Sequence, residues 1–386
     1  MRVKIELFLR EVCEKTTKNN EYPVLTSSKS GLFLQSDYFN KQVASTDNTG
    51  YKIIKKGQFT YRAMSDTGEF YPNMLECVDV GIVSPAYPVF EIFQTDLIIP
   101  EYLKYYFKSN AFQHAISSFA QGSTRTSVKF NKLKTASIDL PSKQEQTKIL
   151  RLLKKAETLI ACRQQELQKL DDLVKARFVE MFGNPEHNDK RWREKPLFRL
   201  CKVGSSKRIY QNELCEQGVP FLKISDLVCK MDKGSCKYAF FIPEDKYDEL
   251  VEQGLVPSPG DILLTARGTL GRCYIIATED RFYFQDGMIT WLSDFDESIC
   301  SQYIAHLFSM KGVKKQIEGL QAGSTVAYLS IAMTKNLKIM VPPIDLQKNF
   351  IAFVEQIDKS KFVESIHVLK LIKEAIAKEV SHDRIR

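Results

Sequence analysis

Pro141–Gly183 reads PSKQEQTKILRLLKKAETLIACRQQELQKLDDLVKARFVEMFG, with neither glycine nor proline between its first and last residues. Apolar side chains recur in it at alternating steps of four and three residues, with one polar break at Arg163. The positions of this seam are Ile149, Leu153, Ala156, Ile160, Leu167, Leu170 and Val174. Such a seam is typical of a long helix that packs against another helix. At about 1.5 Å per residue, about 40 residues span roughly 60 Å, which is too long for a helix inside a small domain.

The ends of this helix carry their own signals. Ser142 lies three residues before Glu145, which is the spacing of a capping box. Gly183 is followed by Asn184 and Pro185, a strong helix stop. The sequence therefore predicts a helix that begins near Pro141 and ends at Gly183.

A second helical stretch starts at Pro342 and runs toward the last residue. Its seam passes through Phe350, Val354, Ile357, Val368, Leu371 and Ala375, with interruptions at Lys361 and Glu364. Because an isolated helix would leave such a stripe in water, we expect the two helices to pack as an antiparallel pair. The alternative, two unrelated surface helices that each dock on their own domain, stays open.

The chain repeats itself at an offset of 201 residues without a gap. The identities pair Tyr102 with Tyr303, Phe107 with Phe308, Ile116 with Ile317, Gly122-Ser123-Thr124 with Gly323-Ser324-Thr325, Pro141 with Pro342, and Gln146 with Gln347. So many matches in one register indicate a tandem of two similar units, each a globular part followed by a helical part.

The globular parts mix strands and helices. Runs such as Val78–Val83 and Gly260–Thr265 are short, β-branched and bounded by turn residues, as strands are. Tyr102–Ser118 and Tyr303–Gly319 have the spacing of amphipathic helices. We therefore predict an α+β fold, with two similar mixed α/β domains joined by two long antiparallel coiled-coil helices in a pseudo-twofold repeat. The predicted boundaries are 1–140 and 185–341 for the globular domains, and 141–184 and 342–386 for the helices.

Composition limits the function only loosely. Lys and Arg total 55 against 47 Asp and Glu, a formal net charge of +8 that permits an anionic partner without identifying one. The nine cysteines are odd in number and form no C-x-x-C pair, so we expect reduced thiols in a cytoplasmic protein. We find no signal peptide, and no apolar run near the ~18 residues that a membrane span requires.

The sequence contains no catalytic signature and no metal-ligand cluster that we can identify. It has no G-x-x-x-x-G-K-[ST] phosphate loop, no dinucleotide-binding G-x-G-x-x-G and no Asn-Pro-Pro-aromatic motif, and its five histidines are scattered. One layout keeps an alternative open, because Asp232 followed by Glu244 and Lys246 fits the D…E-x-K pattern of a metal-dependent nuclease. A coiled-coil scaffold that does not bind DNA is the other alternative.

Basic and hydroxyl side chains gather at turns instead. In the first unit Gly122–Ser127 leads to Lys129, and in the second Ala266–Arg272 forms a glycine-flanked basic loop. Backbone amides, hydroxyls and lysines suit phosphates, and arginine can contact guanine through two hydrogen bonds. Two such loops in two repeated units favour a nucleic-acid-binding face over a set of solvated turns.

Several of these stretches together resemble a known family. The central helix combines Pro141 and Gln144-Glu145-Gln146 with ARFVEMFG at 176–183, and the second domain contains GVPFLKISDL at 218–227. Further along lie GDIL at 260–263 and RGTLG at 267–271. These motifs resemble the specificity subunit of type I restriction-modification systems, and the resemblance covers almost the whole chain.

Three departures from the family pattern are visible. The second helix has Asp345-Leu346-Gln347 in place of the Glu-Gln pair, and its end lacks the EMFG terminator. In the first domain, Tyr61–Ser65 occupies the place of the arginine-glycine loop.

The resemblance implies a chain without chemistry of its own. Each globular domain would be a target recognition domain that reads one half of a bipartite double-stranded DNA site, and the helices would form an antiparallel spacer. The helices would also dock two methyltransferase subunits, which restriction subunits would join. S-adenosylmethionine, ATP and Mg²⁺ are expected only on those partners, so we expect no cofactor, no metal and no catalytic residue in this chain.

Two sets of candidate residues emerge. The candidate DNA contacts are Arg62, Ser65, Ser123, Thr124, Arg125, Lys129, Lys223, Arg267, Thr269, Arg272, Ser324 and Thr325. The candidate partner-docking residues on the helices are Gln146, Ile149, Leu153, Ile160, Leu167, Leu170, Phe350, Val354, Ile357 and Leu371.

Overall fold

The computed structural model describes residues 2–38, 46–117, 126–321 and 327–361. The described residues up to Ala161 form one compact unit, unit 1, and those from Cys162 form a second, unit 2. Because this division falls inside the long central helix, each unit contains one half of that helix.

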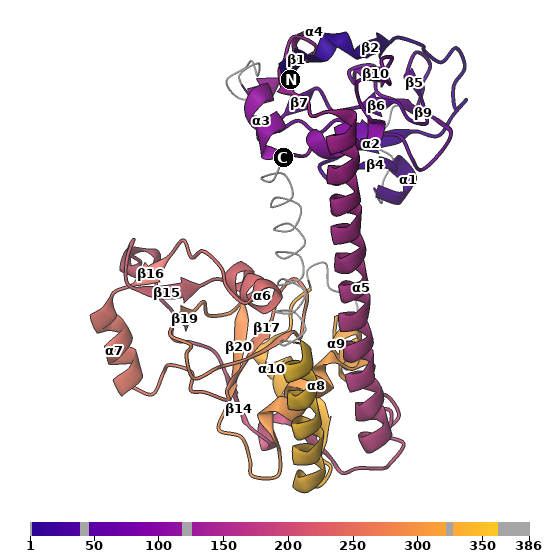
Figure 1. Ribbon diagram of the computed structural model, residues 1–386. Helices are drawn as coiled ribbons and strands as arrows, with labels where there is room; N and C mark the ends of the chain where they lie inside the picture. The colour runs from indigo at the N-terminus through magenta and orange to yellow at the C-terminus, as the bar shows by residue number, and fades with distance from the viewer. Residues whose placement is uncertain (1, 39–45, 118–125, 322–326, 362–386) are drawn as a thin grey trace, which may run out of the picture. The chain divides into compact units, whose positions relative to one another are not determined.

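The predicted central helix is α5, Lys143–Phe182, which Figure 1 shows as one uninterrupted helix. The backbone N–H of Ser142 donates to Glu145 Oε2 at 2.7 Å, and that of Glu145 donates to Ser142 Oγ at 3.3 Å. The helix ends where Gly183 adopts a φ of +78°, a conformation that costs glycine little. The predicted capping box and stop are both confirmed.

Unit 1 contains short strands and helices before α5. They are β1 Arg2–Lys4, η1 Ile5–Leu7, β2 Leu9–Val12, β3 Leu25–Ser27, β4 Leu32–Leu34, α1 Gln35–Tyr38, β5 Lys52–Lys55, β6 Phe59–Thr60, β7 Met64–Ser65, β8 Asn73–Met74, β9 Val80–Val83, β10 Val89–Ile92, α2 Pro100–Tyr106, α3 Asn110–Ser117, β11 Thr126–Ser127, α4 Phe130–Leu133 and β12 Ser137–Asp139. The largest sheet is antiparallel in the order β2-β10-β6-β8. Its core is aromatic, with ring centroids of Phe59, Phe90 and Phe107 between 5.6 and 6.1 Å apart.

Unit 2 has the same plan after the second half of α5. Its elements are β13 Glu194–Pro196, η2 Leu197–Arg199, β14 Lys202–Gly204, η3 Gln211–Glu213, β15 Val219–Leu222, α6 Ile224–Lys233, β16 Phe241–Ile242, α7 Glu244–Glu252, β17 Ile262–Thr265, β18 Cys273–Ile275, β19 Tyr283–Phe284, β20 Ile289–Ser293, α8 Ser301–Ser309, α9 Lys311–Gly319, α10 Ile331–Lys335, β21 Lys338–Met340 and a helix over 344–361. The main sheet is antiparallel in the order β14-β20-β17-β18, and β16-β15-β19 form a second sheet.

The internal repeat is present in the fold. The helices α8, α9 and α10 and the strand β21 each begin 201 residues after α2, α3, α4 and β12. The short strands that open the two units also match, because β1 pairs with β12 and β13 pairs with β21, both antiparallel. The predicted α+β class with two similar mixed domains is therefore confirmed.

Within unit 2 the two helical stretches run antiparallel. Near one end of the contact, the guanidinium of Arg163 on α5 donates to the backbone carbonyl of Lys361 at 2.7 Å. Near the other end, the rings of Phe178 and Phe350 meet edge to face with centroids 5.3 Å apart. The polar break in the predicted seam is thus a helix–helix contact. The part of the second helix that would contain Val368, Leu371 and Ala375 lies outside the described residues.

Gln146 and Gln347 are both fully buried and make the same three hydrogen bonds in their own units. The Gln146 amide accepts from Ile99 N–H and donates to the carbonyls of Leu97 and Pro141, each at 2.9 Å. The Gln347 amide accepts from Cys300 N–H at 2.9 Å and donates to the carbonyls of Ser298 and Pro342 at 2.9 and 2.8 Å. Each glutamine ties the start of a long helix to the loop that precedes α2 or α8.

Replacing either glutamine with leucine is expected to destabilise its unit. Gln347→Leu leaves one buried N–H and two carbonyls without their partners, which lowers the free energy of unfolding by about 2 kcal/mol. Gln146→Leu has the same expected effect in unit 1. Chemical denaturation measures both, and Gln144→Leu, on the exposed side of the same helical turn, is the control. If Gln146→Leu and the control Gln144→Leu had equal free energies of unfolding, the role assigned to the buried amide would be contradicted.

Two predictions made from the sequence are wrong. Ile149 and Ile160 do not lie in the buried seam, because they are 37% and 47% exposed, and Leu150 enters the core of unit 1 instead. The cysteines are not all free thiols either, because Cys229 and Cys236 form a disulfide with their Cα atoms 6.1 Å apart. Gly234, at the left-handed end of α6, turns the chain so that the second cysteine faces the first.

Candidate nucleic-acid interface

The basic loop of unit 2 is a closed turn that comes directly after β17. Thr265 holds it together, because its hydroxyl donates to the carbonyl of Thr269 at 2.5 Å and accepts from Arg272 N–H at 3.0 Å. Gly271 has a φ of +76°, and a Cβ there would lie 2.7 Å from the side chain of Ile317. The positive φ therefore favours glycine at the second glycine of the RGTLG sequence, whereas the Ile317 side chain could shift to admit a Cβ.

Arg267 is the exposed tip of this turn. Its backbone forms an isolated β-bridge with Tyr328, and its guanidinium carbon lies 5.0 Å from the centroid of the Tyr328 ring. Among the residues that the structure describes, no carboxylate forms an ion pair with Arg267. Stacking on tyrosine orients a planar donor that remains available to an acceptor outside the chain. Tyr328 was missed in the sequence, although it lies 201 residues after Ser127 in the repeat.

Two other candidates in unit 2 already have partners. Arg272 donates to Asp232 on α6 at 2.6 Å, and the hydrogen bond from this guanidinium holds the pKa of the Asp232 carboxyl below its usual value. The ammonium of Lys223 lies 3.6 Å from the centroid of the Phe240 ring. Thr269 is exposed next to Arg267, but its carbonyl closes the turn. Arg267 is therefore the candidate least committed to contacts within the unit.

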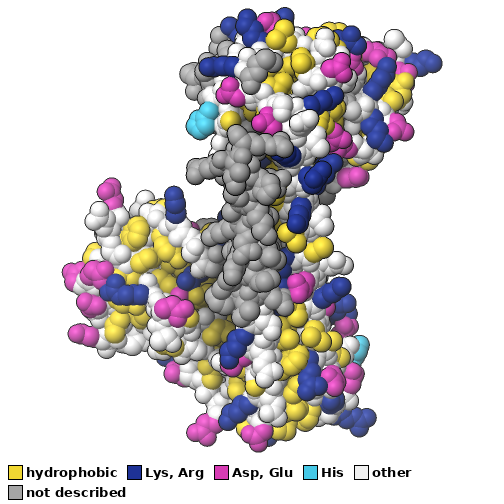
Figure 2. Space-filling view, viewed as in Figure 1, with side chains coloured by type: hydrophobic (Ala, Val, Ile, Leu, Met, Phe, Trp, Pro, Cys, Tyr) yellow, Lys and Arg dark blue, Asp and Glu magenta, His cyan; other side chains and the backbone are white. Residues whose placement is uncertain are grey.

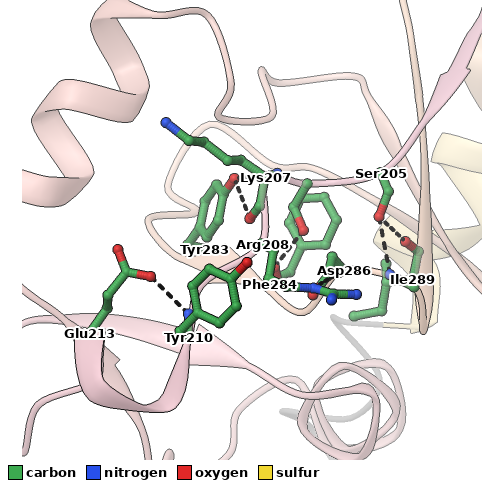
Figure 3. A network of polar contacts seen from close by, with 11 residues as sticks. Ser205, Lys207, Arg208, Tyr210, Glu213, Tyr283, Phe284, Asp286 and Ile289 are labelled. Atoms are coloured by element: carbon green, nitrogen blue, oxygen red, sulfur yellow. Dashed lines mark hydrogen bonds and ion pairs between the residues drawn. The ribbon is translucent and has the colours of Figure 1, made fainter.

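A basic segment that the sequence did not single out comes after β14 (Figure 3). The backbone N–H of Lys207 donates to the Tyr283 hydroxyl at 2.8 Å, and Arg208 donates to Asp286 at 2.8 Å. These contacts fix the backbone and leave Tyr210, 61% exposed, at the end of the segment. A lysine, an arginine and an exposed aromatic on a fixed loop suit phosphate and base contacts.

In unit 1 the candidates Arg62 and Ser65 line a cavity of about 810 Å³. Its wall is rich in hydroxyl groups, and Lys29 and Tyr71 also contribute. Arg62 pairs loosely with Asp66 at 3.8 Å, and the Ser65 hydroxyl lies 3.3 Å from that of Thr67. The structure therefore brings these two candidates to one concave surface.

The remaining candidate DNA contacts are separate. Lys129 is exposed and immediately precedes α4. Ser123, Thr124, Arg125, Ser324 and Thr325, the residues of the repeated Gly-Ser-Thr motif and its neighbour, lie outside the described residues.

The candidate docking residues that the structure describes fall into three groups. Gln146, Phe350 and Val354 are buried within their own units, which leaves their side chains no surface for a partner and corrects their assignment. Leu153, Leu167, Leu170 and Ile357 are half-buried. Ile149 and Ile160 are exposed, and Leu371 lies outside the described residues. The exposed apolar residues of α5 are therefore better docking candidates than the buried ones.

The three residues of the nuclease-like pattern do not form a common site. Asp232 is paired with Arg272, Glu244 with Arg281, and Lys246 with Glu249 and Glu213. No group of three or more His, Cys, Asp or Glu within the described ranges is placed to hold a metal ion. The three side chains are thus separate surface ion pairs.

Charge is mixed over the visible surface of both units. Figure 2 shows the Lys and Arg side chains interspersed with Asp and Glu, without a large basic field on this face. Among the described residues, no helix is both long and apolar enough to cross a membrane. On this face, a contact with an anionic partner would depend on local groups and not on a broad basic field.

Comparisons with known proteins agree on one family. A model described as "Type I restriction modification DNA specificity domain" matches residues 7–172 and 189–373. A putative type I restriction enzyme specificity subunit from Haemophilus influenzae is 28% identical over 161 residues, 42% of this chain and 37% of the relative. The MjaIX specificity subunit from Methanocaldococcus jannaschii is 26% identical over 323 residues, 76% of this chain and 71% of the relative. The chain thus aligns with little more than a third of the first relative and most of the second.

Two solved structures share the fold. One is a chain described under "Structural basis underlying complex assembly and conformational transition of the type I R-M system", with a TM-score of 0.55 and 15% identity over 98% of this chain and 95% of that one. The other is the type I restriction-modification S subunit from M. genitalium, with a TM-score of 0.50 and 14% identity over 99% and 94% of the two chains. At sequence identities this low, the similarity of the two structures to this chain supports a shared fold and nothing further.

Proposed function

The chain belongs to the type I restriction modification DNA specificity family, and on this premise we propose that it is the DNA-recognition subunit of a type I restriction-modification complex. The observation that best supports the proposal is the internal duplication of the chain. The first matched segment covers most of unit 1 and the second covers most of unit 2, and the two units repeat the same secondary structure. Two equivalent units suit a target with two half-sites, because each unit can read one of them.

Arg267 is the best-supported base contact in unit 2. Its guanidinium is exposed, stacked on Tyr328 and carried by a turn that Thr265 holds rigid. An arginine oriented in this way can donate two hydrogen bonds to the O6 and N7 of guanine. Lys207 and Lys129 are better suited to phosphates, which position the protein without reading sequence.

The helices have two proposed tasks. As a single helix of 40 residues, about 60 Å long at 1.5 Å per residue, α5 would set the separation of the two half-sites. Its exposed apolar residues, among them Ile149, Ile160 and Leu173, would contact the methyltransferase subunits. The catalytic cofactor S-adenosylmethionine, and the ATP and Mg²⁺ used in restriction, would then belong to the methyltransferase and restriction subunits.

A binding selection tests the proposal. The assembled complex of this chain with its methyltransferase subunits is incubated with random-sequence duplexes, and the bound fraction is sequenced. We expect enrichment of two short motifs at a fixed separation, and affinity that falls steeply with salt because phosphate contacts release counterions. Salt-sensitive binding without any enriched sequence would contradict a role in recognition.

Glu244→Gln is expected to leave both methylation and DNA cleavage by the assembled complex within about twofold of wild type, because exposed ion pairs contribute little. Methylation and cleavage assays on the same target measure this. Lys246→Ala serves as a second variant from the same layout. Loss of cleavage in both variants with methylation retained would favour the nuclease alternative.

A further inference from the structure

One short strand pairing occurs at equivalent positions in the two units. In unit 1, β7 pairs with β11, so that Met64 lies opposite Ser127. In unit 2, Arg267 forms its bridge with Tyr328. Tyr328 lies 201 residues after Ser127, which is the offset of the whole repeat.

Flanking hydrogen bonds confirm this register. The N–H of Val128 donates to the carbonyl of Ala63 at 3.0 Å, and the N–H of Leu329 donates to the carbonyl of Ala266 at 2.9 Å. Val128 and Leu329 are again 201 residues apart. Met64 therefore occupies in unit 1 the position that Arg267 occupies in unit 2.

Both side chains at this position are available to a ligand. Arg267 is exposed, and Met64 is 46% exposed at the cavity that Arg62 and Ser65 also line. Methionine differs from arginine in the groups that it can recognise. It has no strong donor for guanine, whereas its flexible thioether chain packs well against a methyl group.

We infer that the position shared by Met64 and Arg267 reads a base in each half-site, and that Met64 contacts the 5-methyl group of a thymine. This inference rests on the proposed function. It assigns an A·T pair to the unit 1 half-site where the unit 2 half-site has G·C, because the thymine methyl is the apolar group of the major groove. The hydroxyl groups around the cavity supply the polar contacts beside it.

Methylation mapping with the full complex tests the inference. Met64→Ala is expected to reduce the preference for thymine over cytosine about fourfold to tenfold at one position of the unit 1 half-site, since the contact with one methyl group is lost. Met64→Arg is expected to shift the preference at that position toward guanine. Leu7→Ala removes another exposed apolar side chain of unit 1 and is expected to change nothing.

The outcomes separate the inference from the proposed function. If wild-type methylation depends on this chain and occurs at a bipartite site, but neither Met64 variant alters base preference at any position, the inference is wrong and the function stands. A uniform loss of methylation with unchanged preferences also overturns it. If the wild-type complex methylates no specific sequence, the proposed function fails first.

Discussion

A four-residue insertion after Ala161 is expected to lower methylation of the wild-type target at least 100-fold. Ala161 is the last residue of unit 1 on α5, so the insertion leaves the contacts inside each unit in place. Four residues lengthen a helix by about 6 Å and rotate its C-terminal half by about 40° relative to its N-terminal half. Because the insertion changes both distance and phase, the two reading faces no longer match half-sites at the original separation.

The same insertion has a second readout where the complex still assembles. The methylated sites are expected to keep both half-site sequences and to gain about two base pairs between them, since 6 Å is close to two steps along the duplex. Gln165→Ala, exposed on the same stretch at unchanged helix length, is the control and should keep the original separation. An active complex with an unchanged gap would show that α5 does not set the spacing.

Arg267→Ala is expected to weaken recognition by about 10-fold to 100-fold, and at one half-site only. A two-hydrogen-bond contact from arginine to guanine contributes about 1–3 kcal/mol of discrimination, and alanine removes both donors. The change also leaves the Tyr328 ring without the cation that stacks on it. Mapping of methylated sites should therefore show one relaxed position in the unit 2 half-site and an intact unit 1 half-site.

Unit 2 offers a matched control for this substitution. Arg281 is also an exposed arginine over a tyrosine, with its guanidinium carbon 4.9 Å from the Tyr247 centroid, but it is paired with Glu244. Arg281→Ala should leave the target unchanged. Arg267→Lys should keep salt-dependent binding and lose discrimination, because an ammonium cannot reproduce the planar fork. Full activity and specificity in Arg267→Ala would favour the scaffold alternative.

Local and periodic features could be predicted from the sequence. The seam and end signals of α5 specify a helix whatever the rest of the chain does, and the ungapped match at an offset of 201 residues indicated the repeat. The apolar residues of the second helix were expected to pack, and Phe350 does so against Phe178. These features depend on neighbours a few residues apart or on identity alone.

The errors arose where long-range contacts decide the role of a side chain. Gln146 belongs to a motif on a long helix and was assigned to docking, yet it is fully buried and hydrogen-bonded to Leu97 and Ile99. Arg272 and Lys223 look like free cations in the sequence, but Asp232 and Phe240 reach them from distant positions. The equivalence of Met64 and Arg267 requires strand register, because these two residues are 203 positions apart and so do not align at the 201-residue offset of the repeat.

The Cys229–Cys236 pair illustrates the same limit. Six residues separate the two cysteines, a spacing that matches no recognised motif, and they come together because α6 ends at Gly234. Asp232, the partner of Arg272, lies between them. The disulfide therefore links the two ends of the segment that contains Asp232, the ion-pair partner of Arg272 in the basic loop.

The most direct test of the central claim, that each unit reads one half of a bipartite DNA target, is a map of methylated adenines across a genome. The chain is co-expressed with its methyltransferase subunits in a host that lacks other adenine methylation. We expect chain-dependent methylation at a single motif made of two specified segments at a fixed separation, and Arg267→Ala should relax only one of them. Methylation at one continuous motif, or methylation that does not depend on this chain, would show that the two units do not each read one half-site.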